Sequence, residues 1–389
     1  MGVEMKERLC YISDTVGWVD GNPDGILKKK AAQMELLAEH FDVVMLGFDQ
    51  SHRHIGIRKA DGKFYPIKDV PENIFGKTLK RELFYRMAAS YCRRKKIRRV
   101  YVRYALTDPS FLRFLRSLPK DSDVMVEIPT YPYDKERAQN IRGKILSAED
   151  KLLMPRLRKY VDYIATYSKD AEIAGVPCVN MQNGVVVGNI KMREINTDPN
   201  EIRLLAVASM NFWHGYDRII LGMGAYKKKG GDRRIVLHLV GDGPEVPNLK
   251  KMAEEQGVLE DVIFHGFKGG AELDEISFMC DIAVTNLGLH RLGLEQASPL
   301  KVREYMAQGF PMISVSSVDI SDLLEGHQLL VPVGDDPVDM EDIISFYNEK
   351  DLGNPESAKK EAEELRKLAL KYCDMRVVFA PAVKAFLED

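Results

Sequence analysis

The sequence has few cysteines, and none of them forms a paired motif. The five cysteines of this 389-residue chain are Cys10, Cys92, Cys178, Cys280 and Cys373, and no C-x-x-C occurs. This spacing argues against a disulfide framework and a cysteine zinc site, and it favours reduced thiols in a cytosol. No uncharged apolar run reaches about 18 residues, so no transmembrane helix is expected. The start, MGVEMKERLCYIS, lacks the apolar core of a signal peptide, so a cytoplasmic location is predicted.

Motifs that bind dinucleotides, phosphates or metal ions are also absent. The fingerprint G-x-G-x-x-G does not follow the first predicted strand, and after the strand at 235–240 its third glycine position is Val246. The pattern G-x-x-x-x-G-K-[ST] does not occur, and no D-x-D pair follows an apolar strand in a plausible site. These absences argue against a dehydrogenase, and they predict that neither a cofactor nor a metal ion is required.

Charge is balanced overall but unevenly distributed. The formal net charge of -2 gives no reason to expect binding to nucleic acid. The segment 77–116, however, contains thirteen Lys or Arg and two acidic residues. Its periodicity predicts a basic amphipathic helix with an apolar face formed by Leu79, Leu83, Met87 and Tyr91. The basic face is either solvated or held on anionic lipid, where each basic residue contributes on the order of 1 kcal/mol.

Short apolar segments alternate with helix-length segments, and this pattern occurs twice. In the first half, strands are expected at 8–13, 41–48, 98–104, 122–128 and 161–168, with a helix after Asp24-Gly25. In the second half, strands are expected at 202–209, 233–241, 261–267, 281–286, 310–316 and 328–333. Such alternation builds parallel sheets covered by helices on both faces. We therefore predict two doubly wound, Rossmann-like α/β domains, residues 1–195 and 196–374. A C-terminal helix at 375–389 can pack back on the first domain.

In open α/β sheets, ligands bind at the loops that follow the carboxyl ends of the strands. Gly241, Asp242 and Gly243 form one such loop, whose glycines would let the backbone approach a ligand; a plain tight turn is the alternative. In another loop, His214 and Gly215 precede a helix start, where N–H groups favour an anion. The Arg218 guanidinium would suit two phosphate oxygens. His214 taken alone is also typical of a satisfied surface histidine.

The segment GLEQASPLKVREYMAQGFP starts a predicted helix with a lysine. Ser298 is the predicted N-cap and Pro299 the first helical residue. Lys301 lies in the first turn, where a cation is disfavoured unless an anion joins it. Glu304 lies close to the same face. A bound diphosphate and ribose would explain the two side chains, and the alternative is a surface Lys–Glu pair worth about 0.3 kcal/mol.

Taken in order, these segments resemble the family 4 glycosyltransferases, which are retaining enzymes of the GT-B fold. The similar segments of the second domain are VGDGP, VIFHGF, CDIAVTN and SPLKVREYMAQGFPMI. In the first domain, NPDGILKKKAAQMELLAEHFDVVML resembles the family's glycine loop and first helix. YVRYALTDPSFLRFL and VEIPTYPYDKE look like a bacterial subgroup associated with surface polysaccharide assembly. The resemblance implies a nucleotide-sugar donor, above all a UDP-sugar, and a saccharide or lipid-linked acceptor.

The resemblance also implies where the donor binds. His214 and Lys301 would face the diphosphate, Glu304 would accept from the ribose hydroxyls, and Gly25 would let a first-domain loop approach the donor. The turn at Gly266-Phe267 and the loop at 241–243 would flank the base and ribose. The whole predicted donor site comprises Gly25, His214, Gly215, Arg218, Gly241, Asp242, Gly243, Phe267, Ser298, Pro299, Leu300, Lys301 and Glu304.

Two departures from the family pattern concern the catalytic residues. The first glutamate of the family's E-x7-E pair is replaced by Gln296, with Glu295 one position away. The family's arginine before its Lys-Gly element is also absent, because Ala208-Ser209 stand there. His290 and Arg291, with Arg218, are the candidates to supply the missing contacts and to stabilise the leaving diphosphate.

Candidate acceptor-side residues come from the first domain. Glu127 ends the strand at 122–128 and would orient the acceptor or assist its deprotonation, unless it is simply a polar strand end. Tyr131 and Tyr133 would form a platform for a sugar or lipid. If the basic helix binds the inner face of the cell membrane, the acceptor would be a lipid-linked sugar. Two other functions stay open, a nucleotide-sugar epimerase of the same fold and a non-catalytic nucleotide-sugar-binding subunit.

Overall fold

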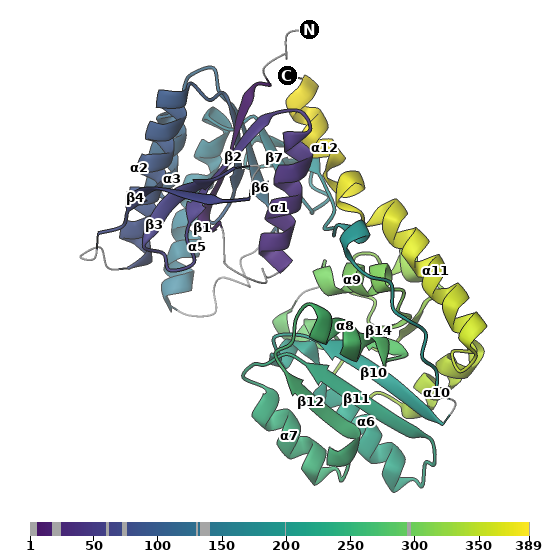
Figure 1. The fold of residues 1–389 in the computed structure, drawn as a ribbon. Helices are drawn as coiled ribbons and strands as arrows, with labels where there is room; N and C mark the ends of the chain where they lie inside the picture. Colours follow the sequence, from purple (N-terminus) through teal and green to yellow (C-terminus); the bar gives the residue numbers. More distant parts are fainter. Residues whose placement is uncertain are drawn as a thin grey trace. The chain divides into compact units, whose positions relative to one another are not determined.

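A computed structural model describes residues 6–17, 25–59, 62–71, 76–129, 131–132, 141–198, 200–293 and 297–388. The chain divides into two compact units, one of Met1–Gly184 with Met375–Asp389 and one of Val185–Asp374 (Figure 1). The second unit begins before the predicted boundary at residue 195, because the preceding segment is bonded to it. Val185 N donates to Cys373 O (3.0 Å), and Arg193 N donates to Gln308 O (2.9 Å).

The described residues of the first unit form a nine-stranded sheet in the order β4-β3-β2-β1-β5-β6-β7-β9-β8. The predicted strands are confirmed as β1 (Arg8–Val16), β2 (Asp42–Phe48), β5 (Arg99–Arg103), β6 (Asp123–Ile128) and β7 (Tyr163–Thr166). The strands that were not predicted are β3 (His54–Arg58), β4 (Phe64–Asp69), β8 (Glu172–Ile173) and β9 (Val176–Asn180). β3, β4 and β8 pair antiparallel at the two sheet edges, where short turns join strands without intervening helices.

The α-helices among the described residues of this unit are α1 (Gly25–Ala38), α2 (Lys77–Lys95), α3 (Pro109–Arg116), α5 (Ile141–Leu153) and α12 (Met375–Glu388). The C-terminal segment forms α12, with Pro381 inside the helix. The Phe386 ring lies 6.2 Å from the Phe41 ring, and Arg376 forms an ion pair with Glu39 (2.6 Å). The last helix therefore belongs to the first unit.

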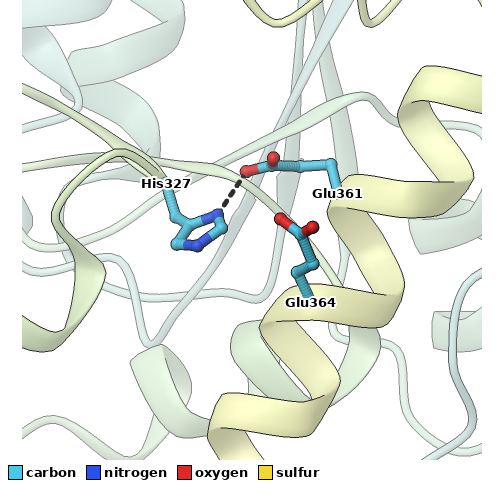
Figure 2. A group of neighbouring side chains, drawn as sticks. All are labelled: His327, Glu361 and Glu364. Atoms are coloured by element: carbon cyan, nitrogen blue, oxygen red, sulfur yellow. Dashed lines mark hydrogen bonds and ion pairs between the residues drawn. The ribbon is translucent and has the colours of Figure 1, made fainter.

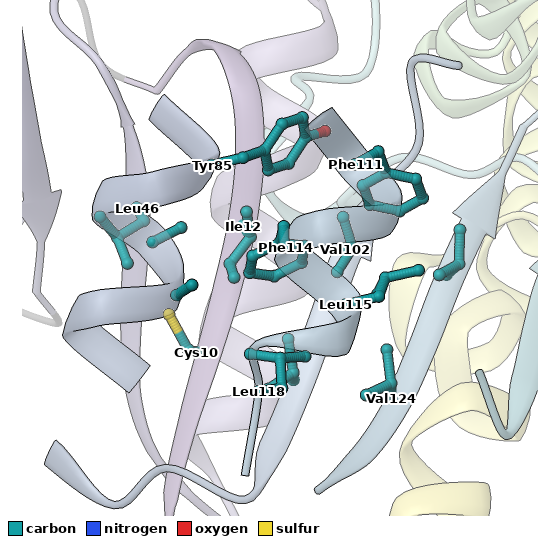
Figure 3. Close-up of a cluster of buried hydrophobic side chains, with 14 of the residues drawn as sticks. Cys10, Ile12, Leu46, Tyr85, Val102, Phe111, Phe114, Leu115, Leu118 and Val124 are labelled. Carbon is teal, nitrogen blue, oxygen red and sulfur yellow. The ribbon is translucent and has the colours of Figure 1, made fainter. Parts of the chain in front are cut away.

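Residues 77–95 of the basic segment form α2 as predicted. The predicted apolar face is confirmed for Tyr91, which is buried, and for Leu83 and Met87, which pack against the core, but not for Leu79. Leu79 is 57% exposed, whereas Phe84 and Tyr85 are fully buried. The Tyr85 ring packs against Phe111 and Phe114 of α3 at centroid distances of 5.3 and 5.2 Å (Figure 3). Aromatic side chains bury more apolar area than leucine, so their placement decides which face of α2 meets the core.

The second unit contains a parallel sheet in the order β12-β11-β10-β13-β14-β15. Its strands are β10 (Glu201–Val207), β11 (Arg234–Val240), β12 (Val262–Gly266), β13 (Ile282–Val284), β14 (Met312–Ser314) and β15 (Gln328–Leu330), all of them predicted. Its helices are α6 (Asp217–Lys228), α7 (Val246–Glu255), α8 (Ala271–Phe278), α9 (Leu300–Gln308), α10 (Met340–Glu349) and α11 (Pro355–Tyr372). The strand order reverses between β10 and β13, which is where an open sheet of this kind places its ligand.

All five cysteines are free thiols, as the spacing of the cysteines predicts. Four of them are buried, and Cys178 is half-buried. Of the helices that the structure describes, none is long and apolar enough to cross a bilayer. The predicted doubly wound α/β architecture is confirmed in both units.

Candidate functional site

The loops that follow β10 and β13 contact each other at the point where the strand order reverses. Leu287 N donates to His214 O (2.8 Å). Gly215 has a φ of 71°, and a Cβ at this position would lie 2.6 Å from Gly288 N. Glycine is therefore required at 215 both by the backbone conformation and by the neighbouring loop. This contact brings the predicted residues of both loops to one edge of the sheet.

His214 is a buried, neutral side chain in this arrangement. Asn211 N donates to His214 Nδ1 (2.9 Å), and the imidazole stacks on the Tyr216 ring at a centroid distance of 5.6 Å. Burial, together with the nearby charge of Lys301, lowers the pKa of His214 to about 3. Because Nδ1 accepts a hydrogen bond, the proton of the neutral ring is on Nε2. His214 thus offers a neutral N–H donor.

Lys301 lies across from these residues on α9. Its Nζ donates to Tyr216 OH (2.9 Å) and lies over the Tyr216 ring, 5.5 Å from the centroid. Burial lowers the pKa of Lys301 to about 7, although the nearby Glu304 carboxylate acts in the opposite direction. Lys301 forms no ion pair within the described part of the chain. An amino group in this environment gains most from a bound anion.

The helix that carries Lys301 starts one residue later than predicted. Pro299 is the N-cap (φ -71°, ψ 131°), Leu300 is the first helical residue, and no hydrogen bond from a described side chain caps the helix. Ser298 is therefore not the N-cap. The buried Arg303 pairs with Asp319 and donates from Nη1 to Pro299 O (3.3 Å), which holds the start of α9 in place. Sequence reasoning missed this arginine, because its partner lies on a separate loop.

Arg218 and Arg291 are occupied by other contacts and are not free cations. The buried Arg218 donates to the backbone carbonyls of Leu287 (2.9 Å), Pro332 (2.9 Å) and Asp336 (2.8 Å). It therefore holds neighbouring loops together, in place of the predicted phosphate contact.

Arg291 forms a bidentate pair with Asp217 (2.9 and 2.7 Å), and its Nε donates to Asp335 (2.7 Å). Its charge is therefore already matched by two carboxylates. His290 Nε2 lies 3.1 Å from the same Asp335 oxygen. His290 and Arg291 therefore position the loop after β13, and the predicted direct catalytic contact is not supported by this geometry.

The glycine loop after β11 is explained by packing against the loop after β10. A Cβ on Gly241 would lie 1.8 Å from Ala208 O, and one on Gly243 would lie 2.6 Å from Met210 O. Asp242 is exposed and accepts from Gly243 N (2.8 Å). The close approach is thus between two loops of the chain, which is a structural reason for the motif. Next to this loop, the Phe267 side chain is 81% exposed.

Glu127 is fully buried in β6 and surrounded by donors. The groups facing its carboxylate are Tyr167 OH (2.8 Å), Tyr101 OH (2.9 Å), Arg103 Nη1 (3.1 Å), Gln33 Nε2 (3.3 Å) and Lys29 Nζ (3.6 Å). Burial alone raises the pKa of this carboxyl, but Arg103 and Lys29 together bring it below its ordinary value. Glu127 is therefore an ionised, buried anchor, and the predicted contact with an acceptor is not supported.

The remaining predicted residues are only partly described. Gly25 is half-buried and begins α1, and Tyr131 is half-buried and packs against the core of the first unit. Tyr133, Glu295 and Gln296 lie outside the described residues. The replacement of the family's first glutamate therefore stays a sequence observation.

One group of possible metal ligands lies on other elements of the second unit. His327, Glu361 and Glu364 are neighbours, with His327 Nδ1 2.7 Å from Glu361 Oε1 (Figure 2). The second oxygen of Glu361 is 3.2 Å from Lys350 Nζ. Lys350 already neutralises this carboxylate, so the group is best explained as a structural link from α11 to the end of α10, by the ion pair, and to the turn before β15, by the hydrogen bond to His327.

Residues 189–366 match the family described as glycosyl transferases group 1. No curated protein matches the sequence significantly. Among solved structures, sucrose-phosphate synthase from Thermosynechococcus elongatus has a TM-score of 0.68 at 13% identity, covering 98% of this chain and 99% of that one. HepE from Anabaena, solved with UDP and glucose, has a TM-score of 0.64 at 12% identity, covering 98% and 100%. WaaG, described as a glycosyltransferase involved in lipopolysaccharide biosynthesis, has a TM-score of 0.61 at 13% identity, covering 97% and 99%. At these identities, the likeness establishes the GT-B fold.

Proposed function

We propose that this chain, whose residues 189–366 match the glycosyl transferases group 1 family, transfers a sugar from a nucleotide-sugar donor to an acceptor hydroxyl. One observation carries the proposal. Lys301, with its lowered pKa and no ion-pair partner among the described residues, lies in the first turn of a helix that no described side chain caps. A diphosphate supplies the negative charge that both the amino group and the helix N-terminus favour.

The proposed chemistry rests on stabilising the leaving group. Cleavage of the sugar–phosphate bond places negative charge on the departing diphosphate. Lys301, the Nε2–H of His214 and the first N–H groups of α9 are preorganised donors for that charge. The acceptor hydroxyl attacks from the face that the phosphate leaves, and a phosphate oxygen helps remove its proton. The anomeric configuration is thereby retained, and the protein's own cation takes the place of a metal ion.

The nucleotide is assigned to the neighbouring loops. Glu304, one turn after Lys301, accepts hydrogen bonds from the ribose hydroxyls, and Phe267 with the glycine loop at 241–243 flanks the base. A UDP-sugar is the proposed donor, supported by the UDP and glucose bound to HepE, which shares this fold. The acceptor is a saccharide or lipid-linked sugar of a surface polysaccharide, supported by the likeness to WaaG.

The proposal is tested by calorimetric titration with a panel of nucleotide sugars. For the nucleotide sugar that binds, Lys301→Ala weakens affinity at least about tenfold, because a charge-assisted contact to phosphate is lost. Glu304→Ala weakens affinity without removing the diphosphate contact. The matched control is Lys251→Ala, an exposed lysine of α7 paired with Glu255, which changes affinity less than about twofold.

Unchanged affinity in both site variants contradicts the assigned roles. Hydrolysis of the donor, or its consumption with an added saccharide, then separates a transferase from a subunit that only binds nucleotide sugars. Conversion of the donor into an isomer with no acceptor consumed would identify an epimerase.

A further inference from the structure

Helix α5 (Ile141–Leu153) exposes three large apolar side chains and buries two polar ones. Ile141 is 79% exposed, Ile145 is 63% exposed and Leu152 is 76% exposed. On the opposite face, Ser147 and Asp150 are buried. An amphipathic helix of a globular unit normally has the reverse arrangement. Packing against the described residues of its own unit therefore does not account for the exposed face of α5.

The exposed apolar residues form a single stripe along the helix. Ile141, Ile145, Ala148 and Leu152 recur at intervals of four and three residues, so they share one face over about 16 Å. Lys144 and Lys151 lie along one side of this stripe, and Arg142 lies on the other side next to the half-buried Glu149. All three basic side chains are exposed. We call the four residues of the stripe and these three basic residues the α5 face.

Polar contacts fix the orientation of α5, so the stripe cannot turn inward. Asp150 Oδ1 accepts hydrogen bonds from the Tyr104 hydroxyl and from Thr107 N (2.7 Å), just before α3. Rotating the helix to bury the stripe would move this carboxylate away from its donors, and buried polar groups without partners are costly. The α5 face is consequently a fixed surface feature of the first unit.

We propose that the α5 face docks on the surface of an anionic lipid bilayer. Isoleucine and leucine side chains enter the boundary between headgroups and acyl chains, while flanking lysines and arginines contact the anionic headgroups. Arg142 and Lys144 form no ion pair with any described residue, so their charge is available. Arg156, Arg158 and Lys159, all exposed, directly follow the helix and add positive charge to the same region of the chain.

A second copy of the chain fits the α5 face less well than a bilayer does. A symmetric contact would bring identical stripes together and place the lysines and arginines of both copies in one interface, where like charges repel. The basic segment 77–116 is in turn a weaker membrane candidate than its composition indicates. Five of its arginines already pair with carboxylates, namely Arg81, Arg98, Arg99, Arg103 and Arg113.

The docking inference rests on the proposed function in one respect: membrane docking would give the enzyme access to a lipid-linked acceptor. Its test is therefore separate from donor binding. The full chain is sedimented with vesicles of phosphatidylglycerol and phosphatidylcholine, and with vesicles of phosphatidylcholine alone, at low and high salt. Binding of the nucleotide sugar identified with the panel is measured in parallel for every variant. If the wild type bound none of the nucleotide sugars of the panel, the proposed function would be contradicted and the docking result would still stand.

Two double variants remove the two components of the α5 face. Ile145→Ser with Leu152→Ser lowers the partition onto anionic vesicles at least about tenfold, because apolar area no longer enters the bilayer. Arg142→Glu with Lys144→Glu lowers it at least about tenfold, because each basic residue is worth about fivefold at such a surface. The replaced side chains are exposed, so both variants keep the fold, as thermal unfolding verifies.

Matched controls come from α2. Leu79→Ser replaces an exposed leucine, and Arg86→Glu with Arg94→Glu reverses two exposed arginines. The α2 variants keep vesicle binding within about twofold of the wild type. The inference is overturned if the wild type does not bind anionic vesicles at low salt, or if the α5 variants bind as well as the wild type. It is also overturned if Ile145→Ser with Leu152→Ser converts a dimer into a monomer in sedimentation velocity while vesicle binding is unchanged.

Discussion

If Lys301 holds the diphosphate as proposed, we expect the affinity for a UDP-sugar donor to decrease about tenfold from pH 6 to pH 8, because Lys301 must then be protonated. Its amino group has a pKa of about 7 in the unliganded chain, since burial disfavours the charged form. A bound diphosphate favours the charged form and raises this pKa. Between the two pKa values, the complex carries a proton that the free protein has lost, so binding takes up a proton.

The magnitude follows from the protonated fraction of free Lys301. With a pKa of about 7, that fraction is about 0.9 at pH 6 and about 0.1 at pH 8. Affinity is proportional to this fraction, so it is constant at low pH and decreases as pH rises through 7. Neither His214 nor the donor contributes in this window. The pKa of His214 is about 3, and the diphosphate diester of UDP-glucose is fully ionised.

The assay is isothermal titration calorimetry from pH 6 to pH 8 in two buffers that differ in ionisation enthalpy. Proton uptake approaches one per donor bound at pH 8 and is close to zero at pH 6. Lys301→Arg is the control, because a guanidinium stays charged and gives a flat profile. An equal pH slope in the wild type and in Lys301→Arg would refute the reasoning, as would a flat wild-type profile.

Two further predictions concern residues whose packing the structure explains. Gly241→Ala lowers the free energy of unfolding by about 3 kcal/mol, because its Cβ would overlap Ala208 O at a φ of 128°. In the control Gly257→Ala, φ is also positive but the added Cβ meets no atom within 4 Å, so the variant loses about 1 kcal/mol. If urea unfolding gave equal losses of unfolding free energy for the two variants, the role of packing at Gly241 would be contradicted. Glu127→Gln costs about 3 kcal/mol near neutral pH, because it leaves the buried charges of Arg103 and Lys29 without their carboxylate. The pKa of Glu127 is lowered in the folded chain, so its contribution is present above the unfolded pKa and is lost as pH falls through the folded value. If Glu127→Gln lowered the free energy of unfolding by less than about 1 kcal/mol, or by the same amount in acid as at neutral pH, the Glu127 carboxylate would not be ionised.

Helix α2 shows where a sequence pattern and the structure diverge. The helical spacing identified α2 and placed Leu83, Met87 and Tyr91 on its core side, but it missed the buried aromatic residues between them. Phe84 and Tyr85 fill the space against α3, and Leu79 is left in solvent. The hairpin of β3 and β4 was missed for a related reason. The strand sequence FYPIKD alternates weakly and contains Pro66, so only its pairing with β3 defines it as a strand.

The candidate site likewise combines features that the sequence shows with contacts that only the structure shows. The unusual position of Lys301 is visible in the sequence, because the preference for anions at a helix start depends only on neighbouring backbone groups. Its contact with Tyr216 spans 85 residues and needs the reversal of strand order between β10 and β13. The sequence also could not show that Arg291 is already paired, since Asp217 begins α6 and Asp335 lies in the loop after β15.

By itself, the sequence determined the alternation of strands and helices, the two parallel sheets and the loops that carry the candidate donor site. Parallel strands are buried on both faces, so each strand is a continuous run of apolar residues, and such runs are visible in the sequence. Only the tertiary structure decided which charges are matched, which histidine is neutral and which way the α5 face points. Pairing, burial and orientation depend on residues that are distant in the chain, and for α5 the hydrogen bonds to Asp150 set the direction of the stripe.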